Sequence, residues 1–222
     1  MLYIGSAVST ACKDTLKKLN IPFSVMKDNR FLPHPINSHP DMSAVFVCGK
    51  LFSAGEMATF FSCADTGEDF GKEYPNDILF NGFTLGKKLF CNKKGFSGTV
   101  IDFAVQNGFE VVNVKQGYAK CSTLLLGEVG AITADKDIKK AVEPFCKVLK
   151  IEAGDVLLPP YDFGFIGGAS FVLGKTVYFF GDISHHRNSN EILNFISELD
   201  FNAVSLSDEP LTDCGGAIWI DE

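Results

Sequence analysis

The chain has 222 residues, of which 46% are hydrophobic and 21% charged, and its formal net charge is −7. This is the composition of a globular protein, and the length allows one sizeable core, so we expect a single domain over residues 1–222. Lys and Arg form no block, which argues against nucleic acid and anionic membranes as partners.

The expected elements alternate between short strands and amphipathic helices. The first half predicts a strand at 2–4, a helix at 9–20, a strand at 21–26, a hairpin at 44–52, a polar loop at 53–77, a second hairpin at 80–90, a helix at 97–107 and a strand at 109–114. The second half predicts a hairpin at 123–132, a helix at 135–149, a hairpin at 170–180, a helix at 188–199 and strands at 202–206 and 217–220. Asp135 is the expected cap of the third helix, and Pro144 is expected to kink or end it.

The four hairpins resemble one another, because each reads as a strand, a glycine turn and a second strand. The turn residues are Gly49, Gly86, Gly127 and Gly174, and Asp221 takes this place in a fifth, truncated copy. Successive turn positions lie 37 to 47 residues apart. Repetition at such a period indicates an array of one supersecondary unit, here two strands, a helix and a strand.

The two ends of the chain complement each other. The fifth copy supplies only the strand at 217–220, whereas the N-terminal segment supplies a strand, a helix and a strand. We therefore expect an α/β fold, a five-fold pseudosymmetric αβ-propeller of ββαβ units. The N- and C-terminal strands pair in this arrangement, which closes the ring and leaves no open sheet edge.

The cysteines and the N-terminus favour a cytoplasmic protein. The chain begins with a strand rather than a secretory leader, and no apolar run reaches the roughly 18 to 20 residues of a membrane span. Its seven cysteines are scattered and include no Cys-x-x-Cys pair, so neither a disulfide framework nor a metal site is predicted. Glycine-rich nucleotide-binding motifs are also missing, and we expect no cofactor.

A five-fold ring of ββαβ units resembles the pentein fold, the αβ-propeller of the guanidine-modifying enzymes. That group includes arginine deiminases, dimethylarginine hydrolases, agmatine deiminases and amidinotransferases, and the fold also serves a ribosomal anti-association factor. The chain most resembles small bacterial proteins of this group that have no assigned activity. The resemblance covers the whole chain in architecture, but its residue matches are confined to short segments.

Polar segments precede the innermost strand of each repeat and should meet at one end of the central axis. These segments are residues 39–43, 74–77, 116–121, 161–168 and 213–216. A concave centre lined by convergent polar groups is the default site for a small-molecule ligand.

Cys214 is the foremost candidate nucleophile. Pentein hydrolases carry their cysteine near the C-terminus, commonly after a histidine, and this chain has Asp213 in the place of that histidine. Glycines follow Cys214 and allow close substrate approach. The alternative is a small buried cysteine at a tight turn, and the adjacent carboxylate would raise the thiol pKa.

The other candidate site residues differ from those of the guanidine-modifying enzymes. Their histidine belongs in the unit before the cysteine, but residues 163–168 contain none. His39 and Asp41 can act as a base and its orienting group if they face the axis, or can simply form a turn. Lys120 and Cys121 stand where the resemblance implies a carboxylate for guanidinium, and a lysine there favours an anionic ligand.

Asp162 and Asp213 complete the candidate binding residues, although Asp162 also suits a proline-rich turn.

Two functions remain open at this point. One is a cysteine-dependent hydrolase or transferase that acts on a small amino-acid-like or anionic metabolite. The other is a non-catalytic pentein that senses a ligand or binds a protein or ribosome, because one fold hosts several functions.

Overall fold

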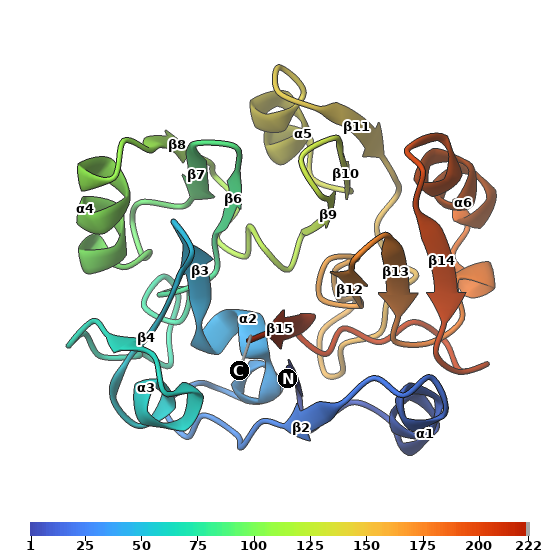
Figure 1. Cartoon of the computed structure of the whole chain (residues 1–222), viewed down its shortest axis with the longest axis horizontal. Coiled ribbons are helices and arrows are strands. Elements are labelled where there is room, and N and C mark those ends of the chain that lie inside the picture. The colour runs from blue at the N-terminus through green and yellow to red at the C-terminus, as the bar shows by residue number, and fades with distance from the viewer. Residues whose placement is uncertain (221–222) are drawn as a thin grey trace.

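Five three-stranded sheets lie around a common centre in the computed structural model, which describes residues 1–220 (Figure 1). Four sheets follow one another along the chain. They are β3 (Val45–Val47), β4 (Lys50–Ser53) and β5 (Ala64–Asp65); β6 (Phe83–Leu85), β7 (Lys88–Cys91) and β8 (Glu110–Asn113); β9 (Thr123–Leu126), β10 (Gly130–Thr133) and β11 (Lys147–Lys150); and β12 (Ser170–Leu173), β13 (Thr176–Phe179) and β14 (Asn202–Ser205).

Each of these sheets is built in the same way. A hairpin pairs the first two strands antiparallel, and a helix then leads to a third strand that runs parallel to the middle one. The connecting helices are α3 (Gly55–Phe61), α4 (Gly98–Gln106), α5 (Lys136–Val142) and α6 (Ser189–Glu198). The repeated ββαβ unit predicted from the sequence is therefore present four times in succession.

The fifth sheet joins the two ends of the chain. Its order is β15 (Ala217–Trp219), β1 (Leu2–Ile4) and β2 (Phe23–Val25), with α1 (Thr10–Lys18) between β1 and β2. β1 pairs antiparallel with β15 and parallel with β2, so this sheet has the same strand directions as the other four. Asp221, the turn position expected in this copy, lies outside the described residues.

The turn glycines behave as predicted. Gly49, Gly86, Gly127 and Gly174 have φ values of 72°, 55°, 58° and 60°, which glycine adopts without steric cost. The N-cap of α5 is also confirmed, because the Asp135 side chain accepts hydrogen bonds from two backbone N–H groups in the first turn of that helix.

Two predicted elements are wrong. The stretch 53–77 is not a loop throughout, because it begins with α3 and β5. The apolar face of α3 is buried through Met57, Ala58 and Phe61, and the polar run follows only afterwards. The helix expected at 135–149 is shorter and ends at Val142, which agrees with the expectation that Pro144 ends it. Residues 143–146 form a turn, and β11 follows.

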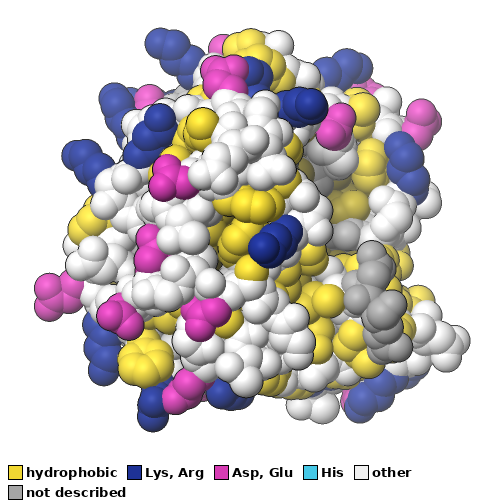
Figure 2. All heavy atoms as spheres, turned by 60° about the vertical axis from the view of Figure 1, so that its left-hand side comes forward, with side chains coloured by type: hydrophobic (Ala, Val, Ile, Leu, Met, Phe, Trp, Pro, Cys, Tyr) yellow, Lys and Arg dark blue, Asp and Glu magenta, His cyan; other side chains and the backbone are white. Residues whose placement is uncertain are grey.

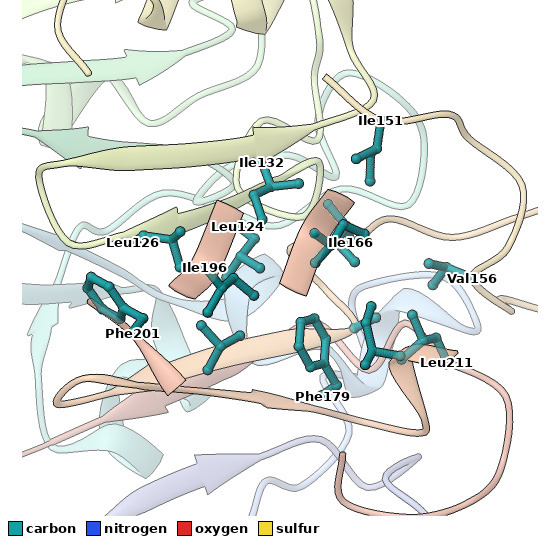
Figure 3. Close-up of a cluster of buried hydrophobic side chains, with 14 residues drawn as sticks. Leu124, Leu126, Ile132, Ile151, Val156, Ile166, Phe179, Ile196, Phe201 and Leu211 are labelled. Carbon is teal, nitrogen blue, oxygen red and sulfur yellow. The ribbon is translucent and has the colours of Figure 1, made fainter. Parts of the chain in front are cut away.

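Apolar side chains between neighbouring units form the core. Figure 3 shows one such cluster between the third and fourth sheets, where Leu124 and Ile132 meet Phe179 and Ile196. The four side chains are at most 2% exposed. Packing of this kind holds adjacent ββαβ units together, because none of the small sheets can bury its own apolar faces.

Charged side chains of both signs are interspersed on the face shown in Figure 2, with apolar side chains between them. Within residues 1–220, no helix has the length and apolar character needed to cross a membrane. A short helix, α2 (Pro40–Ser43), precedes β3 and lies towards the centre of the molecule, beside β15 (Figure 1).

Candidate active site in the central cavity

Backbone hydrogen bonds join four of the central segments. Gly168 N–H donates to the Cys121 carbonyl at 2.9 Å, and the Gly168 carbonyl accepts from the N–H groups of Cys214 and Gly216 at 3.0 and 2.8 Å. Asp41 N–H in turn donates to the Gly215 carbonyl at 3.2 Å. The first, third, fourth and fifth units are thus fixed to one another at the axis.

Glycines leave room for the Asp213 side chain among the central segments. A Cβ atom at Gly168 would lie 1.9 Å from Asp213 Oδ1, so no other residue fits there without displacing the carboxylate. Asp213 Oδ2 accepts from Phe165 N–H at 2.9 Å, and Oδ1 accepts from Gly215 N–H at 3.1 Å. The carboxylate is therefore held on both oxygens, and the residue is 1% exposed.

Cys121 contacts a second buried carboxylate. Its thiol donates to Asp41 Oδ2 at 3.0 Å, which joins the third unit to α2 in the first. Asn81 fixes both partners, because its side-chain amide donates to Cys121 Sγ at 3.1 Å and to the Asp41 carbonyl at 3.2 Å. The Asn81 Oδ1 atom accepts from the N–H groups of Lys120 and Cys121 at 2.8 and 3.3 Å.

The side chain of His39 lies beside these groups without a hydrogen bond. Both ring nitrogens are buried and lack a partner, and Nδ1 is 3.7 Å from Asp213 Oδ1. A Cβ atom at Gly215, where φ is +73°, would lie 2.3 Å from His39 Cβ. The ring thus packs against a glycine backbone and presents its polar atoms to the site.

A cavity of about 260 Å³ opens over this cluster. His39, Cys121 and Asp213 line it from three different units, and aromatic side chains form much of the rest of its wall. The full lining consists of Ile36, His39, Tyr118, Cys121, Leu158, Tyr161, Asp162, Phe163, Phe165 and Asp213. The expectation of a polar centre enclosed by several repeats agrees with this geometry.

Burial dominates the electrostatics of the cluster. It raises the pKa of Asp41 to about 6, although His39 and Lys120 oppose the shift. Burial also raises the pKa of Asp213. The pKa of the Cys121 thiol is raised well above its usual value, first by burial and then by the neighbouring carboxylates of Asp41 and Asp213. The burial of Cys121 and the two carboxylates therefore favour the thiol form over the thiolate.

The structure brings His39, Asp41, Cys121 and Asp213 together, but it places Cys214 elsewhere. Cys214 is 1% exposed and packs in the apolar cluster that contains Leu2, Ile4 and Leu16. Burial, followed by the Asp213 charge, raises the pKa of its thiol. Its neighbour Asp213 lines the cavity, where the backbone N–H groups of Phe165 and Gly215 hold its carboxylate.

The two remaining candidates are not part of this buried cluster. Asp162 is exposed and lies in the wall of the cavity, next to Tyr161. Lys120 is half-buried and is not part of the lining, but its charge opposes the raised pKa values of Asp41 and Asp213.

Sequence reasoning missed Asn81, which organises the Cys121–Asp41 contact. An asparagine followed by glycine reads locally as a turn, so the sequence contained no signal for this role. Tyr118 and Asp77 were noted only as parts of central segments. The Tyr118 hydroxyl donates to Asp77 Oδ2 at 2.7 Å, which fixes an aromatic wall of the cavity.

A second cavity, of about 300 Å³, lies between the third and fourth units and shares Phe163 and Phe165 with the first. Two of its titratable side chains already have local structural partners. Asp135 caps α5, and His186 Nδ1 accepts from the Asn188 N–H group at 3.0 Å. The central cavity is therefore the better candidate for chemistry.

Comparisons with known proteins agree with the fold. The model of the "Family of unknown function (DUF6873)" matches residues 3–218. Two solved structures are similar: DDAH from Pseudomonas aeruginosa, a mutant complexed with citrulline, at 11% identity and TM-score 0.53, and a dimethylarginine dimethylaminohydrolase adduct with S-methyl-L-thiocitrulline, at 10% identity and TM-score 0.55. The alignments cover 90% of this chain and 81% and 82% of those chains. No curated protein matches. The resemblance to the pentein superfamily is thus confirmed at the level of the fold.

Proposed function

This chain belongs to the DUF6873 family and has the pentein fold, and we propose that its central cavity is the active site of a cysteine-dependent hydrolase or transferase. The observation that supports this proposal is the convergence of a thiol, an imidazole and two carboxylates at one buried point from the first, third and fifth units. Such groups are costly to bury, and strongly perturbed groups in a cavity are typical of functional sites.

In the proposed reaction Cys121 is the nucleophile. Asp41, 3.0 Å from its sulfur, would take the thiol proton as Sγ forms a bond to an electrophilic carbon of the substrate. His39 would give a proton to the leaving group, and Asp213 would orient the imidazole. Water or an acceptor nucleophile would then attack the carbonyl carbon of the thioester intermediate and break its C–S bond. His39 would take the proton of the attacking group, and Asp41 would return its proton to the Cys121 sulfur, which restores the starting state.

The wall of the cavity favours an amino-acid-like substrate. Asp162 and Asp213 provide carboxylates for an ammonium group, and Tyr161 and Phe163 provide aromatic surface near it. Lys120 lies outside the lining, which makes a purely anionic ligand the weaker of the two classes that the sequence left open.

The test compares two serine substitutions. We expect turnover with at least one compound in a panel of amino-acid amides and thioesters, and a loss of roughly 100-fold or more in kcat for Cys121→Ser, the range found when a nucleophile is removed. Cys214→Ser, a buried cysteine outside the cavity, should keep its kcat. A reversal of the two results would move the nucleophile to Cys214.

If the wild-type protein turns over nothing in the panel but is stabilised by one of these compounds, the catalytic proposal fails and a non-catalytic binding pocket replaces it. If Cys121→Ser retains full turnover, the proposed role of this thiol is wrong even though the protein is an enzyme.

The proposed site also depends on a closed five-fold ring, in which β15 and β1 join the last unit to the first. The shared sheet of the two termini supports closure, because it repeats the strand directions of the other four sheets.

A further inference from the structure

Three side chains in the wall of the cavity are of the types that bind metal ions such as Zn²⁺. A ring nitrogen of His39, the sulfur of Cys121 and a carboxylate oxygen of Asp213 lie within 4.8 Å of one another, and all three residues are buried. Within the described part of the chain, no other group of histidine, cysteine and acidic side chains meets this condition. Imidazole, thiolate and carboxylate are the three ligand types that Zn²⁺ prefers.

The hydrogen bonding of His39 independently indicates a missing ligand. The residue is 1% exposed, yet neither Nδ1 nor Nε2 has a hydrogen-bond partner, and the Oδ1 atom of the adjacent Asp41 is also unpaired. Buried polar atoms are nearly always paired, so a cluster of unpaired ones requires an explanation. A cation bound to one ring nitrogen of His39 would give that nitrogen a partner.

The distances are close to those of a tetrahedral site. Zinc bonds of about 2.0 to 2.3 Å place two ligand atoms roughly 3.3 to 3.6 Å apart. His39 Nδ1 and Asp213 Oδ1 are already 3.7 Å apart. The Cys121 sulfur lies within 4.8 Å of the other two ligand atoms, so it has to approach them by at most about 1.2 Å, which rotation of its side chain can provide once the hydrogen bond to Asp41 is released.

We propose that His39, Cys121 and Asp213 bind a divalent cation of the Zn²⁺ class, with the fourth coordination position open to the cavity. The charges balance, because the metal displaces the thiol proton and then carries one thiolate and one carboxylate. The sulfur ligand selects Zn²⁺ or Co²⁺ over Mg²⁺ and Ca²⁺. This inference goes beyond the proposed function and does not depend on it. A metal-bound sulfur is unavailable as a nucleophile, so the two uses of Cys121 exclude each other at any moment.

Cobalt titration of the chelator-treated wild-type protein tests this site. We expect one equivalent of Co²⁺ to bind with a near-ultraviolet thiolate-to-cobalt absorption band, and Zn²⁺ to abolish the band by displacement. Cys121→Ser should lose the band and bind Zn²⁺ roughly 100-fold or more weakly, since even groups that only support a ligand contribute 10- to 100-fold. Cys214→Ser, the matched buried cysteine outside the site, should keep both the band and the affinity.

A second measurement uses only the wild-type protein and therefore does not depend on how well a variant folds. X-ray absorption at the zinc edge should show one sulfur and otherwise nitrogen and oxygen neighbours around a bound Zn²⁺. A shell without sulfur, or a cobalt band that persists in Cys121→Ser, would overturn the proposal, as would failure to bind one equivalent. These measurements require no turnover. The metal-site proposal can therefore be refuted while the proposal of thiol catalysis stands, and thiol catalysis can be refuted while the metal site stands.

Discussion

Removing residues 1–6 takes β1 out of the sheet that it shares with β15 and β2. The side chains of Leu2 and Ile4 are 2% and 0% exposed, and burying each stabilises the fold by roughly 1.5 to 3 kcal/mol. Their loss should therefore cost about 3 to 6 kcal/mol before the lost strand pairing is added. Since 1 kcal/mol corresponds to roughly 2 to 4 °C for a chain of this length, we expect Tm to fall by about 6 to 24 °C.

Circular dichroism during heating measures this change, and two point substitutions in the full chain serve as a matched pair. Ile4→Ala should lower the free energy of unfolding in urea by about 2 to 5 kcal/mol. Val25 lies directly opposite Ile4 in the parallel pair but is 41% exposed, so Val25→Ala should cost less than about 1 kcal/mol. An unchanged Tm in the truncated chain, or equal costs for the two substitutions, would refute the pairing of the chain ends and with it the closed ring.

Three other substitutions test the site and its surroundings. Asn81→Leu leaves the buried N–H of Cys121 and the partly buried N–H of Lys120 without their acceptor, and an unpaired buried group costs roughly 1 to 3 kcal/mol. Urea unfolding should therefore show a loss of about 1 to 4 kcal/mol, and no loss would contradict the role of this amide. Gly215→Ala should lower Tm and shift the imidazole NMR signals of His39, because the new Cβ would lie 2.3 Å from His39 Cβ, and unchanged spectra would show that the ring does not pack there. Hydrogen bonds from Arg187 lower the pKa of Asp155 from 3.8 to about 2, so its carboxylate stabilises the fold above about pH 4 and loses this effect as the pH falls through 2. Asp155→Asn should therefore be less stable than wild type at pH 7, and the difference in stability should disappear between pH 4 and 2. A difference that does not depend on pH would contradict the pairing of Asp155 with Arg187.

The repeated units were readable from the sequence because they depend on local chemistry. Gly86 and Gly174 indicate hairpin turns, because the left-handed backbone conformation that they adopt there disfavours other residues. Alternating apolar residues on either side of the turn predict paired strands, and the amphipathic pattern of residues 188–199 predicts a helix with one buried face. The errors at α3 and after Val142 occur where an element is too short for its periodicity to be recognised.

The candidate site was only partly predictable. Polar segments in corresponding places of the repeats indicated a central pocket, and His39, Asp41, Cys121 and Asp213 were among its expected residues. Their contacts were not predictable, because Cys121 and Asp41 are 80 residues apart and come from different units.

Tertiary structure alone decided which cysteine meets the carboxylates. Cys214 and Asp213 are adjacent in the chain, and the close packing of Gly168 against the Asp213 carboxylate places Asp213 at the cavity. The same packing sends Cys214 into the apolar cluster with Leu2. Local patterns determine the units, because strands, turns and helices follow from neighbouring residues. The site depends on how the units meet, and this is fixed by contacts between side chains that are distant in the chain.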